Sequence, residues 1–416
     1  MHPLLLVALA LISAALAEPD GASGEDLELS AEDLKAIEEA LAADMETQVS
    51  TPEVPLPLVT SRGATALQSL NPDISFIADI ALAALTSDMP LQTGGHDPTA
   101  NGFNLQQLEL SVSKPVDPYF RFDANIVFSQ FGVEVEEVYA TTLGMPWRLQ
   151  MRVGQFLTRF GRVNATHPHT WDFVDQSFAI GRVFGAEGNR GLGLELSWLA
   201  PLPWYLEILV SETMIGGEAT NRSWKDFVTL GVKGPLDLQI TVACKQFFPL
   251  TPDLSLMWGL SYAGGPNGTG RINRSEVYGS DLYFKYRPIT TGSYSMVSLH
   301  TEWFYRRRQV PDDIISDASG FTQFTWRFAR RWALGARHEL GTPEKNSDGD
   351  TSAEALDPHW TSSRHRAAIN TTFWPTEFSR LRLQGGRDFA EWIEEPAWSA
   401  FLAFEFNVGA HGAHTF

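Results

Sequence analysis

Residues 119–128, with the sequence YFRFDANIVF, decide the expected fold because apolar and polar residues alternate along most of their length. Phe120 and Phe122 fall in one set, and Arg121 and Asp123 fall in the other. Successive side chains of a β-strand point to opposite faces, so these two sets lie on opposite sides of one sheet. The stretch therefore predicts a strand with one apolar face and one charged face.

The same alternation recurs from residue 73 onward in segments of roughly ten residues. The apolar sets of four further segments are Trp147, Leu149, Met151 and Val153; Trp204, Leu206, Ile208 and Val210; Phe324, Trp326 and Phe328; and Leu381 and Leu383. Polar and charged residues occupy many of the positions between them. A large closed sheet with this pattern is expected to place its apolar face in lipid and its polar face around a wet lumen.

Short turns alternate with long polar loops along this region. Residues 114–118 and 144–146 are short connections, whereas 160–188 and 341–363 are long ones. Transmembrane barrels have short periplasmic turns and long extracellular loops. The predicted fold class is therefore all-β: a transmembrane antiparallel β-barrel of roughly 16 to 18 strands over residues 73–416, preceded by a short N-terminal helical spacer.

The N-terminus predicts export. Residues 1–17, MHPLLLVALALISAALA, contain an apolar run and end in a small-x-small cleavage site, which is typical of a signal peptide. Residues 18–72 are acidic, and apolar residues at helical spacing predict a short amphipathic helix over 31–45. We expect 18–72 to be a periplasmic spacer, which is either simply solvated or docks a partner.

The composition excludes some functions. The formal net charge is −19, which gives no support for nucleic-acid binding, since that function favours basic patches. The chain has one cysteine, Cys244, so it cannot form an intrachain disulfide. Ser298 and His300 are two residues apart, but this spacing is routine in a strand, and we expect no enzymatic activity.

Charged residues on the polar faces are the predicted lining of the pore. The residues predicted to line the pore are Arg121, Asp123, Arg148, Arg152, Arg327, Arg380 and Arg382. Further acids on the polar faces include Glu109, Glu136, Glu195, Glu207, Glu302 and Glu405. Such residues either line the permeation path or pair with one another only to hold the wall together.

The segment 160–188 is longer than a hairpin needs and contains apolar residues, so we expect it to fold inward and form the constriction. The charged residues expected at this constriction are Arg159, Arg162, Asp172 and Asp175, with Arg148 and Arg152 on the wall opposite the two acids. Opposed charges across a narrow pore would create a transverse field that orients polar solutes.

Several motifs resemble a known family. The segment 149–161, LQMRVGQFLTRFG, resembles the strand-to-loop motif of the phosphate-selective porin family, and 172–176 and 188–193 fall where that family has its inward-folding third loop and the next strand. The segments 94–102, GGHDPTANG, and 409–414, GAHGAH, are similar to a subgroup labelled zinc-regulated, TonB-dependent outer-membrane receptors. The resemblance implies an outer-membrane porin and, within the subgroup, a link to zinc.

Histidines in the expected loops offer candidate metal ligands. His167 and His169, together with Asp172, have the residue types that suit Zn²⁺, whereas the alternative is that exposed loop histidines bind nothing. His96 with Asp97, and the histidines of 411–414, are further candidates. Zinc is the one cofactor that this pattern suggests.

The leading hypothesis is a porin of the bacterial outer membrane that passes small polar or charged solutes by diffusion. The alternative is a zinc-linked receptor or binding barrel, with or without coupling to TonB, and a third is a structural barrel without flux. Expected partners are outer-membrane lipid, small polar solutes, two further copies in a homotrimer, and the barrel-assembly machinery. The terminal aromatic residue Phe416 is the expected signal for that machinery.

Overall fold

The computed structural model describes residues 72–129, 132–215, 220–224, 232–270, 272–289, 294–352 and 356–409. The chain divides into two compact units, Met1–Asn71 and Pro72–Phe416, and every described residue belongs to the second. The expected signal peptide, the expected helix over 31–45, the histidines of 411–414 and the expected assembly signal Phe416 lie outside the described residues. These expectations stay predictions.

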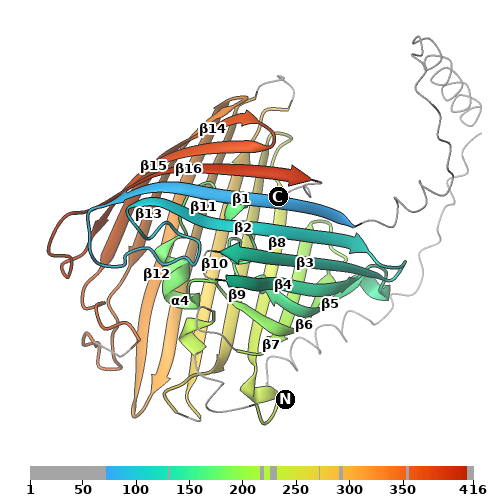
Figure 1. Cartoon of the computed structure of the whole chain (residues 1–416). Coiled ribbons are helices and arrows are strands. Elements are labelled where there is room, and N and C mark those ends of the chain that lie inside the picture. Colours follow the sequence, from blue (N-terminus) through green and yellow to red (C-terminus); the bar gives the residue numbers. More distant parts are fainter. Residues whose placement is uncertain are drawn as a thin grey trace, which may run out of the picture. The chain divides into compact units, whose positions relative to one another are not determined.

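In the described part of the chain, sixteen antiparallel strands close into a barrel (Figure 1). They are β1 (Asp73–Leu85), β2 (Gly102–Pro115), β3 (Phe120–Ser129), β4 (Gly132–Thr142), β5 (Leu149–Leu157), β6 (Arg190–Leu199), β7 (Tyr205–Thr213), β8 (Gln239–Pro249), β9 (Leu254–Pro266), β10 (Arg274–Tyr286), β11 (Met296–Val310), β12 (Asp313–Ala329), β13 (Trp332–Gly341), β14 (Arg364–Thr376), β15 (Ser379–Phe389) and β16 (Ala397–Gly409). Each strand pairs with its neighbours in sequence, and β1 pairs with β16 to close the sheet, for example at Leu82 and Leu402. The predicted antiparallel barrel of 16 to 18 strands is confirmed.

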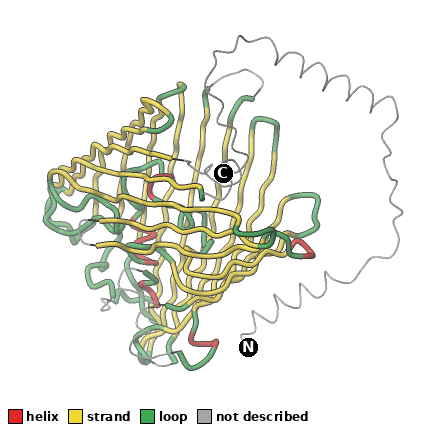
Figure 2. The backbone as a smooth tube through the Cα atoms, turned by 45° about the vertical axis from the view of Figure 1, so that its right-hand side comes forward, coloured by secondary structure: helices red, strands yellow, loops and turns green. Residues whose placement is uncertain are grey.

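Helical segments are short, as Figure 2 shows by the small red portions beside the yellow strands. They are α4 (Phe178–Phe184) and the single-turn 3-10 helices η1 (Pro146–Arg148), η2 (Pro168–Thr170), η3 (Arg222–Trp224) and η4 (Pro235–Asp237). Among the described residues, no helix has the length and hydropathy needed to cross a bilayer.

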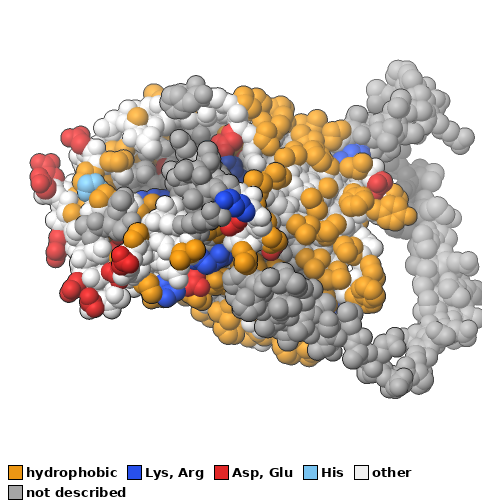
Figure 3. Space-filling model, turned by 90° about the horizontal axis from the view of Figure 1, so that it is seen from below, with side chains coloured by type: hydrophobic (Ala, Val, Ile, Leu, Met, Phe, Trp, Pro, Cys, Tyr) orange, Lys and Arg blue, Asp and Glu red, His pale blue; other side chains and the backbone are white. Residues whose placement is uncertain are grey.

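The two faces of the sheet differ as the alternation predicts. On β1 the side chains of Ile74, Phe76 and Leu82 point outward and are exposed, whereas Ser75 and Asp79 point inward and are buried. On β12 the expected apolar set faces outward in the same way. Figure 3 shows hydrophobic side chains spread over the wall and acidic side chains gathered toward one end. The outer wall is therefore suited to lipid, and the polar face surrounds the lumen.

One expected strand begins later than its sequence suggests. The alternation predicted a strand from Trp147, but the backbone of Trp147 and Arg148 is left-handed, with φ of 58° and 60°, and these residues belong to η1. Strand β5 begins at Leu149. Arg148 is exposed in this turn, so it does not share the inner face of β5 with Arg152, and this part of the prediction is wrong.

A charge placed on the lipid-facing side should destabilise the barrel according to its depth. Leu383 is exposed near the middle of β15, and we expect Leu383→Arg to lower the free energy of unfolding by about 2–4 kcal/mol. Phe389 lies on the same face at the end of this strand, where the same substitution should cost about 0–1 kcal/mol. Urea titration in lipid vesicles would measure both values, and equal effects at the two positions would contradict this orientation of β15.

The hydrophobic core lies inside the barrel. Helix α4 is buried along its whole length, and its Phe184 packs against Phe160 and Phe304 with ring centroids 4.9 and 5.9 Å apart. Trp224 and Trp360, from two other loops, belong to the same cluster. Because lipid covers the outside, the apolar residues of these loops find their packing partners in the lumen.

Candidate functional site

The segment 158–189, which joins β5 to β6 and is called the inner loop below, runs inside the barrel. Near its start, Glu302 on β11 accepts hydrogen bonds from the backbone N–H groups of Arg162 (2.7 Å) and Val163 (2.8 Å). Gly161 allows this approach, because its φ is +58° and a Cβ atom there would lie 2.6 Å from a carboxylate oxygen of Glu302. The inward course expected of 160–188 is therefore observed, and its role as a constriction stays a prediction.

Two of the predicted pore-lining arginines hold the middle of the inner loop. Arg380 on β15 donates to the carbonyl oxygens of His169 (2.7 Å) and Trp171 (2.9 Å), and it also pairs with Glu405. Arg382 donates to the carbonyl oxygen of Phe173 at 2.8 Å. Both side chains lie on the inner face of the sheet and hold the loop backbone, and their role as pore-lining residues stays a prediction.

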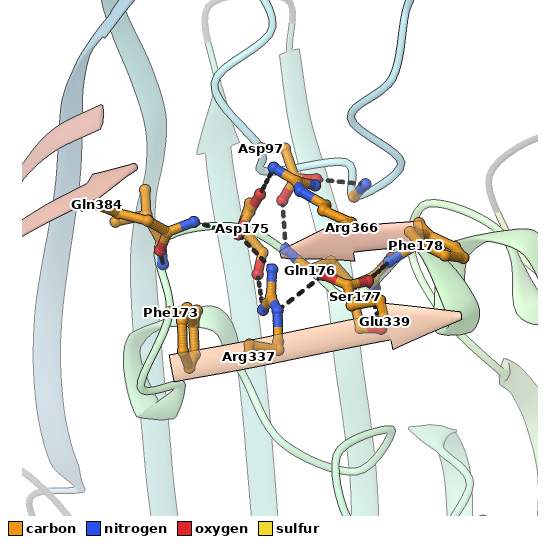
Figure 4. A network of polar contacts seen from close by, with 12 residues as sticks. Asp97, Phe173, Asp175, Gln176, Ser177, Phe178, Arg337, Glu339, Arg366 and Gln384 are labelled. Carbon is orange, nitrogen blue, oxygen red and sulfur yellow. Dashed lines mark hydrogen bonds and ion pairs between the residues drawn. The ribbon is translucent and has the colours of Figure 1, made fainter. Parts of the chain in front are cut away.

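Asp175 is the centre of the polar network that fastens the inner loop to the wall (Figure 4). Its carboxylate pairs with Arg337 on β13 at 2.6 Å and with Arg366 on β14, and it accepts a hydrogen bond from Gln384 on β15 at 2.7 Å. All of these side chains are buried. One loop carboxylate therefore joins three neighbouring strands.

Glu339 on β13 completes this network, as Figure 4 also shows. It accepts hydrogen bonds from the hydroxyl of Ser177 (2.8 Å) and from the backbone N–H of Phe178 (2.7 Å). Ser177 is the N-cap of α4, and its side chain accepts from the N–H of Ala179. The wall thus holds the first turn of the helix in place.

The charge of Asp175 is maintained by its partners. Burial alone would raise the pKa of Asp175, but Arg366 and Arg337 outweigh this effect and lower the pKa from 3.8 to about 2. The neighbouring Asp97, in the loop between β1 and β2, has the opposite behaviour, since burial and the charge of Asp175 raise its pKa to about 7. At neutral pH Asp175 is therefore ionised and compensates two buried guanidinium groups.

The expected pairing between the loop acids and the wall differs from the observed one. Asp175 pairs with Arg337 and Arg366, and Asp172 accepts a hydrogen bond from Thr325 at 2.9 Å, whereas Arg152 pairs with Glu195 at 3.1 Å. The inner loop crosses the lumen and meets β12 to β15, so its acids lie away from the strand that precedes it. The expectation that Arg148 and Arg152 face these acids is wrong.

Other predicted residues stabilise the wall. Arg159 pairs with Glu195 (2.7 Å) and Glu207 (3.0 Å). Arg121 and Asp123 pair with each other at 2.8 Å, where the arginine side chain is 49 % exposed. Arg327 lies on the ring of Trp374 and donates to the carbonyl oxygen of Arg330. These pairs fit the alternative in which arginines hold the wall together.

A cavity with both polar and apolar side chains in its lining lies between the inner loop and strands β10 to β13. Its volume is about 160 Å³, and its lining includes Arg162, Asp172 and Asp175 of the loop and Tyr283 and Arg337 of the wall. The guanidinium of Arg162 lies 4.0 Å from the ring centroid of Tyr283. The cavity therefore contains charges of both signs, and three of the four charged residues expected at the constriction line it.

The histidines of the inner loop contact acids that sequence reasoning did not connect with them. His167 lies 3.0 Å from Glu136 through Nδ1 and 2.9 Å from Glu137 through Nε2. His169 lies 3.1 Å from Glu109, and the two imidazole rings stack with centroids 5.8 Å apart. Asp172, the expected third ligand, bonds instead to Thr325 on β12. The alternation placed Glu109 and Glu136, but not Glu137, on the inner face, and nothing local showed which loop residues they would meet.

Comparison with known sequences identifies one relative. No family model matches the chain. It is 32 % identical over 394 residues to a protein of Aquifex aeolicus (strain VF5) that is described only as "Uncharacterized protein", and the alignment covers 83 % of this chain and 80 % of the relative.

Solved structures with the same fold are outer-membrane barrels. OprB of Pseudomonas putida has a TM-score of 0.55 at 10 % identity, covering 83 % of this chain and 97 % of its own. The anion-selective porin of Comamonas acidovorans has a TM-score of 0.51 at 11 % identity (81 % and 99 %). The trimer form of OmpT, an outer membrane protein of Vibrio cholerae, has a TM-score of 0.50 at 8 % identity (81 % and 99 %). With its apolar outer wall, the chain is a porin-like barrel of the bacterial outer membrane.

Proposed function

The chain belongs to the same family as the Aquifex aeolicus protein, and we propose that it is a diffusion channel for small polar or charged solutes. The observation that carries the proposal is the cavity between the inner loop and β10 to β13, whose lining contains charges of both signs. A closed barrel of this strand number can leave an aqueous channel, and a loop folded into it narrows that channel. The cavity is then the narrowest part of the permeation path.

Arg162 is the residue we assign to solute selection. Its backbone is fixed by Glu302, while its side chain lies against Tyr283 and near Met257, with Nη1 3.3 Å from the Met257 sulfur. The cavity's other arginine, Arg337, forms ion pairs with Asp175 and Glu339. Arg162 therefore offers the positive charge that a passing anion would meet, and its fixed backbone keeps that charge in position.

The test is the reversal potential of the purified protein in a planar bilayer that separates two salt concentrations. We expect Arg162→Glu to shift the ratio of anion to cation permeability about tenfold toward cations, since charges in a narrow polar channel set the local ion concentration. The Debye length is about 8 Å at physiological salt, so screening is incomplete across such a gap.

Arg148→Glu is the matched control, because it makes the same change of charge in the exposed turn η1. We expect its reversal potential to equal that of the wild type. Wild-type protein that conducts no ions would contradict the proposed function. Equal shifts of the reversal potential in both variants would show that Arg162 does not lie in the permeation path.

We extend the proposal to assembly. The chain forms a homotrimer that the barrel-assembly machinery inserts, and the trimer form of OmpT, which has the same fold, supports the expected oligomer. Chemical crosslinking in outer membranes would yield a band at three times the mass of the single chain. Coupling to TonB stays part of the alternative that the sequence resemblance suggests, and the absence of enzymatic activity stays a prediction.

A further inference from the structure

A cluster of histidine and glutamate side chains lies where two loops meet the wall, apart from the cavity described above. We call it the His–Glu cluster. Its members are His96 from the loop between β1 and β2, His167, His169 and Glu187 from the inner loop, Glu109 from β2, and Glu136 and Glu137 from β4. Segments far apart in the sequence therefore bring seven groups with metal-binding side chains to one place.

Three members have the spacing of a cation site. The ligand atoms of His96, Glu136 and Glu187 lie within 4.8 Å of one another. Nε2 of His96 is 3.3 Å from Oε2 of Glu187. Two ligands that each lie about 2.1 Å from a tetrahedral Zn²⁺ are separated by about 3.4 Å, so this pair already has the required distance. A small shift of Glu136 would complete the set.

The orientation of His96 favours the same interpretation. Its Nδ1 lies 3.3 Å from the carbonyl oxygen of Gln106 and can donate to it, whereas its buried Nε2 points to the Glu187 carboxylate at 3.3 Å. Metal-binding histidines commonly donate one ring N–H to a backbone carbonyl, which leaves the other nitrogen as the ligand. The orientation of the ring therefore suits a ligand that would bind an ion through Nε2, beside Glu136 and Glu187, while Nδ1 donates to Gln106.

There is also space for an ion at this point. A cavity of about 20 Å³ is lined by His96, Glu136 and Glu187, and a volume of this order holds one water-sized particle. Gly95 lets the two loops approach, because a Cβ atom there would lie 1.7 Å from a carboxylate oxygen of Glu187. All three candidate ligands are in the lining of this void, and the rest of the lining comes mainly from the inner loop.

The charge of the cluster favours a cation. The side chains of Glu109, Glu136, Glu137 and Glu187 are 1 %, 5 %, 7 % and 9 % exposed, and their ion-pair partners are the histidines of the cluster. Burying carboxylates without compensation is costly, and in the metal-free cluster the histidines supply the compensating charge, because, against the lowering effect of burial, the neighbouring glutamates raise the pKa of His96 and of His167. A divalent cation bound here would displace the proton from Nε2 of His96 and compensate two carboxylate charges in its place.

We propose that His96, Glu136 and Glu187 bind a divalent transition-metal cation such as Zn²⁺, which fastens the loop between β1 and β2 and the inner loop to strand β4. One imidazole and two carboxylates suit this class of ion, since imidazole is a poor ligand for Mg²⁺ and Ca²⁺. His167 and Glu109 lie beside the shared ligand Glu136 and form a neighbouring triad with it. The proposal does not rest on the proposed diffusion function.

The experiment is a calorimetric titration of the chelator-treated, purified full chain with ZnCl₂, with MgCl₂ and CaCl₂ for comparison. We expect Zn²⁺ to bind, and His96→Ala and Glu136→Gln each to weaken binding about 100-fold or more, beyond the effect of changing a residue that only supports a ligand. Zn²⁺ should raise the unfolding temperature of the wild type but not that of His96→Ala. This second measurement also reports whether the variant folds.

Two controls separate this site from others. Glu276→Gln removes a carboxylate that pairs with Arg307 elsewhere, and it should leave Zn²⁺ binding unchanged. His365→Ala removes one of two exposed imidazoles on β13 and β14 that lie 3.4 Å apart and could share an adventitious ion. Three outcomes would overturn the proposal: no Zn²⁺ binding by the wild type, loss of binding in His365→Ala alone, or loss in His167→Ala while His96→Ala still binds.

Discussion

Shortening the inner loop is expected to raise the single-channel conductance at least about threefold, because a barrel of this strand number leaves an aqueous channel when no loop fills it. The deletion removes residues 162–186 and joins the remaining ends with a short Gly-Ser turn. Leu157 and Arg190 are register partners at the ends of β5 and β6, so a short connection can span them. Arg337 and Arg366, which lose Asp175, then face water instead of a packed interior.

The measurement needs evidence that the shortened barrel has folded, which heat-dependent migration in detergent gels provides. A matched control deletes the exposed residues 347–350 from the loop between β13 and β14, which changes loop length without removing a member of the buried cluster. We expect the conductance of this control to equal that of the wild type. A folded deletion variant with wild-type conductance would show that the inner loop does not limit flux.

The fold could be predicted from sequence because the decisive signal is local. The alternation in β3 and β12 depends only on which face each side chain occupies, and lipid on one side imposes that pattern on every strand. Trp147 and Arg148 are an exception. Their residue types continue the alternating pattern of β5, but their backbone forms a left-handed turn before the strand begins. Alternation reports the faces of residues but not the residue at which a strand begins.

The site could be predicted only in outline. The length and apolar content of 160–188 predicted an inward loop, but the partners of Asp175 come from strands 162 or more residues further along the chain. No local pattern encodes such pairing, because it depends on where the loop crosses the lumen. The same reason explains why Glu136 was expected on the inner face whereas its place beside His96 and Glu187 was not.

Asp175→Asn is expected to lower the free energy of unfolding at neutral pH by about 3 kcal/mol or more, because it leaves two buried guanidinium groups without their shared carboxylate. The substitution keeps the shape of the side chain, so the loss reflects charge and not packing. Arg337 retains Glu339 as a partner at 2.8 Å, and this contact limits the loss. Urea titration of wild type and variant gives the difference.

This difference should depend on pH in a defined window. The folded-state pKa of Asp175 is about 2, below its ordinary value of 3.8, so the carboxylate stabilises the folded state fully above about pH 4. The contribution is lost as the pH falls from about 4 toward about 2, where Asp175 becomes protonated and resembles asparagine. The stabilities of wild type and Asp175→Asn should therefore converge at the acid end of this range.

Asp123→Asn provides the matched control, since it removes a carboxylate that pairs with a largely exposed arginine, Arg121. Because solvent reaches the arginine and screens this pair, it contributes about 1 kcal/mol or less, and the control should unfold nearly as the wild type does. Comparable losses in Asp123→Asn and Asp175→Asn would show that burial of the Asp175 network adds nothing. A difference between wild type and Asp175→Asn that stays constant from pH 7 to the acid end would contradict the assignment of its stabilising effect to the ionised carboxylate.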